Sequence, residues 1–154
     1  MISYINNIFK LDTKNTSYVI RISSFNHVLS DYYGAKIIDN ESFEFSKEKY
    51  GSPYGTTVNY KEEDFNYSLD MLSLEVSSVG KGDFKEPSII IDNGKDYILD
   101  LIYQGYDINK TFTPLITLPS PHKELEELVI HLKDELLNIK VDLHYIVDEE
   151  SDVI

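Results

Sequence analysis

The sequence predicts an all-β domain, and three observations carry this prediction. The 154 residues include 12 Tyr and 7 Phe, and such an aromatic content favours strands. Apolar and polar side chains alternate along several stretches, most strictly in residues 17–23 and 138–147, as they do on a half-buried strand. Clusters of Gly, Pro, Asn and Asp separate these stretches and indicate turns. With 42% hydrophobic residues the chain can bury a core, so we expect one domain over residues 1–154.

Residues 2–30 are expected to form strands joined by turns. The side chains that share one face of the stretch 17–23 are Tyr18, Ile20 and Ile22. Val19 and Arg21 point to the opposite face, since successive side chains of a strand alternate. Because Arg21 is the only arginine of the chain, we considered it as a ligand clamp, but we interpret it as a solvated or cross-strand charge.

His27 and a pair of tyrosines are candidate site residues that we interpret as structural. Asn26 and His27 indicate a turn, and no Ser or Asp stands at the spacing of a catalytic triad from this histidine. We therefore expect a partly buried or surface histidine and not a catalytic base. Tyr32 and Tyr33 precede Gly34 and could stack on a sugar, but core packing at a strand end is the favoured interpretation.

Residues 40–64 predict a long irregular loop. Their density of Gly, Pro and Ser indicates turns, and loops of this length are often functional. One hypothesis is a mobile surface loop whose acidic run at 62–64 is solvated; three neighbouring acids do not face each other as a glycosidase pair does. The other hypothesis is a loop that binds a sugar or contacts a second subunit. The candidate residues of this loop are Tyr50, Pro53, Tyr54 and Tyr60.

The middle of the chain predicts further strands and turns. Residues 67–77 and 97–103 have the composition of strands, and residues 89–91 that of a buried strand. The Gly-Lys-Gly sequence at 80–82 predicts a turn and not a phosphate loop, because the Lys-Ser/Thr pair and the following helix are missing. Asn93-Gly94 stands between apolar runs and predicts a hairpin.

The last third contains an ambiguous segment. Residues 104–121 predict a loop-rich crossover, with His122 exposed after it. Residues 124–139 have apolar residues at helical spacing and many good helix formers, yet part of the same segment also alternates as a strand does. On periodicity alone the two interpretations are equal. Residues 139–147 alternate without ambiguity.

Charge and composition exclude several classes of function. The net charge of −13 argues against nucleic acid and against anionic membrane surfaces as partners, because both require a basic face. The chain has no cysteine and therefore no disulfide framework or thiolate metal site. His131 and His144 lack an identifiable third ligand, so we expect neither a metal nor a cofactor. Residues 1–12 carry no basic region and no long apolar run, and we expect a cytoplasmic protein.

Four blocks of the sequence together resemble a known family. They read NTSYVIRI at 15–22, DYYGAKI at 31–37, LDMLSLEVSSVGKGDFKEP at 69–87 and LKDELLNIKVDLHYIVDEESDVI at 132–154. In this order and spacing they resemble the start of the α-galactosidases of glycoside hydrolase family 36. The chain departs from the pattern after Glu75, where Val76-Ser77 replaces an aromatic-proline pair, and at Val79, which replaces an aromatic residue.

The resemblance implies both a fold and a parent enzyme. It implies an antiparallel β-sandwich with little or no helix, part of a larger supersandwich, in which residues 127–133 and 138–147 pair as a hairpin. In the family a (β/α)8 barrel follows and hydrolyses terminal α-galactosyl groups of oligosaccharides such as melibiose and raffinose, with two barrel aspartates as catalytic residues. None of the catalytic motifs occurs in this chain, so it is expected to be a fragment without catalytic residues and inactive alone.

The resemblance also implies partners. Family members form oligomers in which a sandwich loop of one subunit reaches the barrel of the next, and residues 40–64 fall at the place of that loop. The expected partners are therefore the catalytic barrel, α-galactoside oligosaccharides bound by the parent enzyme, and further copies of the chain. The alternatives are a free-standing carbohydrate-binding module and a purely structural sandwich. If the sandwich is incomplete, the strand at 138–147 is left at an open edge, and we expect self-association there.

Overall fold

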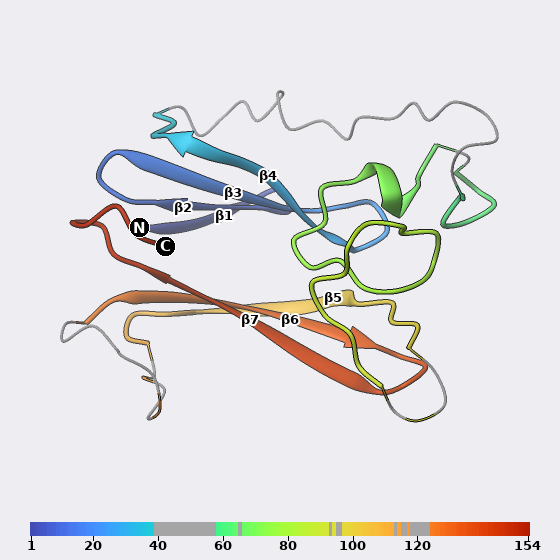
Figure 1. The fold of residues 1–154 in the computed structure, drawn as a ribbon. Helices are drawn as coiled ribbons and strands as arrows, with labels where there is room; N and C mark the ends of the chain where they lie inside the picture. The colour runs from blue at the N-terminus through green and yellow to red at the C-terminus, as the bar shows by residue number, and fades with distance from the viewer. Residues whose placement is uncertain are drawn as a thin grey trace.

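Two antiparallel sheets packed face to face make up the structure (Figure 1). The computed structural model describes residues 1–38, 58–64, 66–92, 94, 97–112, 114, 117 and 124–154. The first sheet contains, in spatial order, β1 (Ile2–Ile5), β2 (Ile8–Asp12), β3 (Thr16–Ile22) and β4 (Val28–Ala35). The second contains β5 (Ile102–Asn109), β6 (Glu126–Asp134) and β7 (Ile139–Val147). In the described part of the chain, helix is limited to one 3-10 turn, η2 (Leu69–Met71), so the predicted all-β sandwich is confirmed.

The first sheet is a meander built on short turns. Asn6 and Asn7 both have positive φ, 51° and 64°, which is what a two-residue hairpin turn between β1 and β2 requires. Asn26 has φ 61° in the turn between β3 and β4. The predicted strands within residues 2–30 and the turn at Asn26-His27 are therefore confirmed. Arg21 of β3 forms a cross-strand ion pair with Asp31 of β4 at 2.8 Å, as one of its two interpretations expected.

The second sheet resolves the ambiguous segment. β6 pairs with β7 from Glu126 to Asp134 and with β5 on its other side, so the hairpin implied by the family resemblance is confirmed and a helix is excluded. The backbone N–H of Leu137 donates to Asp134 Oδ1 at 2.7 Å in the turn. Tertiary pairing on both edges of β6 outweighs its helix propensity, which is worth only tenths of a kcal/mol per residue.

β5 overlaps the strand predicted at 97–103 only at Ile102 and Tyr103, and residues 97–101 form no strand. Residues 104–121 were expected to be a crossover loop, yet β5 continues to Asn109. Its sequence, IYQGYDIN, contains Gln104 and Gly105 in the middle, and its pairing with β6 is irregular between Tyr103 and Gly105. The strand is formed through its pairing with β6, a long-range contact that single-sequence periodicity does not show.

The core lies between the two sheets. Its fully buried members come from β2, β3 and β6 on the inward faces: Phe9, Leu11, Ile20, Leu128 and Ile130. The ring of Tyr4 lies 4.5 Å from Phe9 and 4.7 Å from Tyr106 of β5, measured between centroids, so aromatic contacts join the sheets. Val141, Leu143 and Tyr145 of β7 also pack against this core. The apolar face of β7 is therefore covered by the chain itself. On the edge that faces away from β6, β7 pairs with no other described strand.

The segment between the sheets corrects three predictions. Residues 67–77 contain η2 and a single bridge from Leu74 to Leu29, and not the expected strand. Ile89 forms an isolated parallel bridge with Ser78, and Ile90 is 62% exposed, so residues 89–91 are not a buried strand. The described residues on either side of position 93, which is itself outside the described part, do not form the expected hairpin. The predicted turn at 80–82 is confirmed, since the N–H of Asp83 donates to the carbonyl of Gly80 at 3.0 Å.

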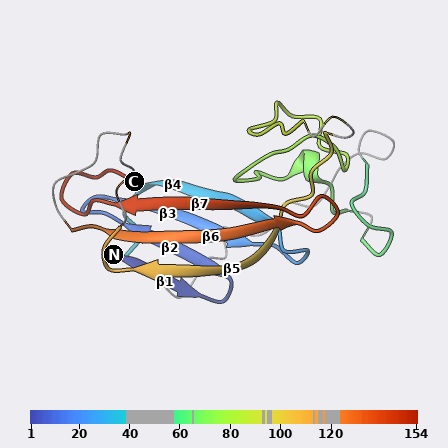
Figure 2. The same ribbon diagram turned by 90° about the horizontal axis from the view of Figure 1, so that it is seen from below.

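These loops gather at one end of the sandwich. Figure 2 shows the described residues between 58 and 101 beyond the ends of the strands, on the side opposite the two chain termini. We call the described residues between 58 and 101 the loop end. They form few regular ladders, so other contacts with the sheets hold them, among them backbone hydrogen bonds such as the one from the N–H of Ser30 to the carbonyl of Ser73.

Candidate functional site

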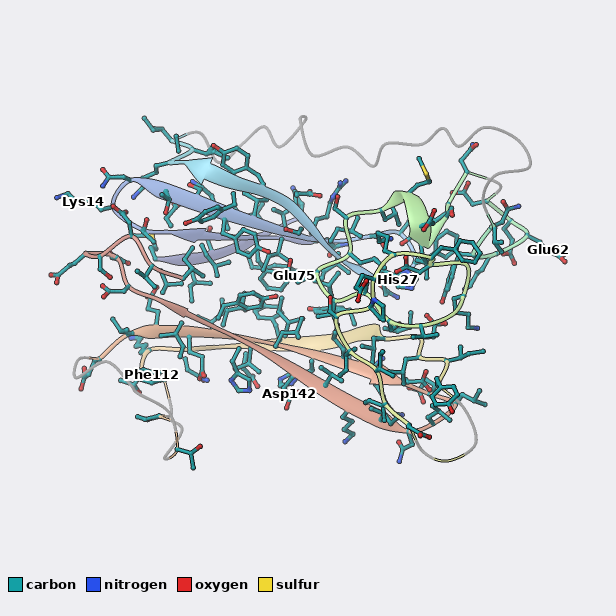
Figure 3. The ribbon with its side chains drawn as sticks, in the orientation of Figure 1. Lys14, His27, Glu62, Glu75, Phe112 and Asp142 are labelled. Atoms are coloured by element: carbon teal, nitrogen blue, oxygen red, sulfur yellow. The ribbon has the colours of Figure 1, made fainter. Side chains whose placement is uncertain are left out.

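A buried hydrogen-bonded cluster lies where the loop end meets the first sheet. Tyr67 is fully buried, and its hydroxyl lies 2.6 Å from Ser23 Oγ and 2.9 Å from His27 Nδ1. The other ring nitrogen of His27 lies 3.3 Å from Asp100 Oδ1. Tyr60 donates its hydroxyl proton to Asp100 Oδ2 at 2.8 Å. We call these five residues the His27 cluster; Figure 3 shows His27 at the junction of the loops and the strands.

Local backbone structure positions the members of the cluster. The turn between β3 and β4 is closed by the N–H of Ser23, which donates to the carbonyl of His27 at 2.8 Å, and the N–H of His27 donates to Ser23 Oγ at 2.9 Å. Tyr67 stands just before η2, and Asp100 stands just before β5. Elements far apart in the sequence therefore converge on the turn between β3 and β4.

The electrostatics of the cluster determine the protonation states of Asp100 and Tyr60. Burial acts to raise the pKa of Asp100, but the hydrogen bonds with His27 and Tyr60 outweigh it, and the pKa lies below its usual value. The ammonium group of Lys81, 3.6 Å from Asp100 Oδ2, acts in the same direction. Burial and the hydrogen bond to Asp100 raise the pKa of Tyr60 above its ordinary range. Asp100 is therefore a carboxylate and Tyr60 a neutral donor at neutral pH.

The arrangement suits anchoring better than catalysis. Ser23 and His27 are each 4% exposed, and the hydroxyl of Tyr67, not that of Ser23, contacts the imidazole ring. Aromatic rings enclose the group: Tyr60 lies 4.6 Å from His27 and Phe25 lies 4.6 Å from Tyr67, between centroids. A triad needs a nucleophile in direct contact with its base and open to substrate, and neither condition is met here.

Sequence reasoning named two members of this cluster as site candidates, Tyr60 and His27. Tyr60 was predicted as a loop residue that binds sugar or a subunit, and the structure places it on Asp100. Tyr50, Pro53 and Tyr54 lie outside the described residues, so their roles stay predictions. His27 is not arranged as a catalytic base, as expected, but it is more deeply buried than predicted, and its Asp partner is 73 positions away. That separation explains why no spacing in the sequence revealed Asp100 or Tyr67.

The other candidate residues separate into structural and exposed groups. Tyr33 is 64% exposed, so core packing is wrong for it; its ring makes an edge contact with Tyr18 at 5.9 Å. Tyr32 donates its hydroxyl proton to the carbonyl of Ala35 at 2.8 Å. Over the described ranges, no group of three His, Cys, Asp or Glu side chains is placed to hold a metal ion. No helix in the same ranges is long and apolar enough to span a membrane.

A second anchor joins the loop end to both sheets. Glu75 Oε2 accepts a hydrogen bond from the hydroxyl of Tyr18 in β3 at 2.5 Å, and its Oε1 accepts one from Tyr145 in β7 at 2.8 Å. The backbone N–H of Glu75 donates to the carbonyl of Val28 in β4 at 2.9 Å. One carboxylate therefore connects the two layers of the sandwich and the loop end, and Figure 3 shows it between them.

The fold and these anchors define a class: a β-sandwich domain whose described residues fasten a set of loops to both sheets. Comparison with known proteins shows which family this is. The chain belongs to the family described as the glycosyl hydrolase family 36 N-terminal domain, whose model matches residues 26–154. The resemblance seen in the four sequence blocks is confirmed.

Curated relatives and solved structures agree with this membership. The chain is 30% identical to alpha-galactosidase 2 of Pediococcus pentosaceus, over 96% of this chain and 20% of that protein. It is 34% identical to the bifunctional alpha-galactosidase/sucrose kinase AgaSK of Mediterraneibacter gnavus, over 96% of this chain and 16% of that protein. The solved galactosidase domain of AgaSK superposes with a TM-score of 0.87 at 31% identity, covering 97% of this chain and 21% of that one.

A further solved relative was crystallised with a sugar. It is the family 36 alpha-galactosidase AgaA from Geobacillus stearothermophilus in complex with raffinose, with a TM-score of 0.82 and 26% identity over 93% of this chain and 20% of that one. The chain therefore spans about a fifth of the length of the relatives that it matches.

Proposed function

We propose that this chain is the non-catalytic N-terminal domain of an α-galactosidase that hydrolyses terminal α-galactosyl residues of oligosaccharides. The observation that carries the proposal is the match of the family 36 N-terminal domain to residues 26–154. The two curated relatives described above are both named as alpha-galactosidases. Raffinose and stachyose, bound in solved relatives, represent the class of substrate for the parent enzyme.

The role of the domain is to hold the loop end for assembly and for shaping the active site. The His27 cluster and Glu75 fasten the loop end to both sheets. Large apolar side chains stand exposed on the loop end: Val58, Met71, Phe84, Ile90, Tyr97 and Ile98. Burying them against another domain or subunit is favourable by roughly 25 cal/mol per Å², which supports contact with the catalytic barrel and a homo-oligomer. The absence of cysteine supports a cytoplasmic location.

Two measurements on the purified chain test this role. We expect no hydrolysis of an aryl α-galactoside, because the two catalytic aspartates of the family lie on the barrel and not on this domain. Turnover that follows the protein through purification, and that is lost on substitution of one of its own acids, would contradict the proposal. Calorimetric titration with raffinose should show no binding by the chain alone. Saturable binding would instead favour a free-standing carbohydrate-binding module.

A further inference from the structure

A histidine on the outer face of the second sheet lies between two carboxylates from the neighbouring strands. His131 of β6 has Nδ1 2.8 Å from Asp142 Oδ1 of β7 and Nε2 3.0 Å from Asp107 Oδ2 of β5. Val141 and Leu143, on either side of Asp142, pack into the core, so Asp142 points away from the first sheet, as Figure 3 shows. One imidazole ring therefore connects all three strands of this sheet.

The number of protons on the ring decides whether both contacts are hydrogen bonds. A carboxylate is only an acceptor, and a neutral imidazole has a single N–H. In the neutral state one of the two hydrogen bonds is lost, and the lone pair of the unprotonated ring nitrogen faces the negative charge of a carboxylate. The imidazolium form donates from both nitrogens, and its two hydrogen bonds are charge-assisted.

The remaining charged groups on this face do not cancel the effect. Lys133, two residues along β6, pairs with Glu135 at 2.6 Å, and Lys140 lies opposite Lys133 on β7; both disfavour a further positive charge. Towards the other end of the face, His144 pairs with Glu127 at 2.9 Å. The hydrogen bonds with Asp142 and then Asp107 nevertheless raise the pKa of His131 above its usual value.

We propose that His131 is a protonation-dependent tie across the second sheet. When both ring nitrogens are protonated, the ring donates hydrogen bonds to β5 and to β7. When only one nitrogen is protonated, one of these two hydrogen bonds is lost. Because the pKa of the folded state lies above the unfolded value of about 6.5, the stabilisation is complete below that value and is lost as pH rises through the folded pKa. β7 has one strand neighbour among the described residues, so the tie acts on an edge strand.

The direct test is an NMR titration of the imidazole groups in the 154-residue chain. We expect the midpoint of His131 to lie above about 6.5, with both ring nitrogens protonated at pH 6. Asp142→Asn and Asp107→Asn should each lower the midpoint. A midpoint at or below the ordinary value, or one that neither substitution moves, would overturn the proposal.

A stability measurement checks the consequence for the sheet. The thermal midpoint of the wild-type chain should fall as pH rises from neutral to mildly alkaline values, and His131→Gln should flatten this dependence. His144→Gln is the matched control, because His144 lies on the same face and contacts the carboxylate of Glu127, and this variant should keep the dependence. An unchanged slope in a folded His131→Gln variant would overturn the tie; if that variant does not fold, the NMR titration of the wild-type protein decides.

Discussion

Replacing Glu75 should loosen the sandwich as a whole and not only the loop end. The carboxylate accepts hydrogen bonds from Tyr18 and Tyr145, which lie on different sheets. Glu75→Ala leaves both hydroxyl groups without this acceptor, although Tyr18 keeps its contact with Ser30 Oγ at 3.0 Å. Glu75→Gln keeps one oxygen acceptor and is the conservative variant.

The geometry sets the size of the expected loss. A hydrogen bond to a charged group contributes about 1.5–3 kcal/mol to stability. Glu75 is half-buried, so the lower value applies, and the two bonds together are worth about 3 kcal/mol. For a domain of this size about 1 kcal/mol lowers the thermal midpoint by about 2–4 °C. Glu75→Ala should therefore lower it by about 6–12 °C, and Glu75→Gln by less.

Thermal and urea unfolding of a double-mutant set measures this effect. Tyr145→Phe alone should cost about 1.5 kcal/mol, and it should cost much less in the Glu75→Ala background because the bond is already absent. Tyr33→Phe is the control, since its ring is 64% exposed, and it should change the free energy of unfolding by less than about 0.5 kcal/mol. Additive effects of Glu75→Ala and Tyr145→Phe, or a loss under about 1 kcal/mol for Glu75→Ala, would refute this reasoning.

Burial and neighbouring carboxylates raise the pKa of Tyr18, Tyr60 and Tyr145 above the ordinary range. Stability should therefore fall as pH rises above about 10, and an ultraviolet titration should show these tyrosines ionising only on unfolding; reversible ionisation of all 12 tyrosines in the folded chain would contradict this. Gly82 and Gly94 have similar φ, 82° and 78°, but a Cβ at Gly82 would lie 2.7 Å from Val58 Cβ, and one at Gly94 would meet no atom of the described residues within 4 Å. Gly82→Ala should therefore lower the thermal midpoint more than Gly94→Ala, and equal effects would disprove the packing described. The open edge of β7 should produce self-association that increases with concentration and with salt, because salt screens the net charge of −13; a monomer throughout a sedimentation series would count against it.

Local pattern and family resemblance predicted different parts of the fold. Strict alternation identified β3 and β7, because each has one face on the core and the other turned away from it. Residues 124–139 could not be decided by pattern, since propensity favoured a helix and only the pairing of β6 on both edges makes it a strand. Residues 104–109 of β5 were missed because only their pairing with β6 makes them a strand.

The contacts of the His27 cluster could not be predicted from the sequence for a different reason. His27 was recognised as a histidine in a turn, but its partners Tyr67 and Asp100 come from residues 40 and 73 positions away. Asn93-Gly94 predicted a hairpin from local turn chemistry, yet Ile89 pairs with Ser78 and the N–H of Leu99 donates to the carbonyl of Val79 at 3.1 Å. In both cases contacts between residues far apart in the sequence decide the structure, and the spacing of residues in the sequence does not predict such contacts.

The sequence of the coding region that follows residue 154 tests the proposed role of the domain most directly. We expect the natural reading frame to continue through further sandwich strands into a (β/α)8 barrel that carries two catalytic aspartates. A natural stop codon directly after residue 154 would contradict the proposal that this domain serves an α-galactosidase within the same polypeptide.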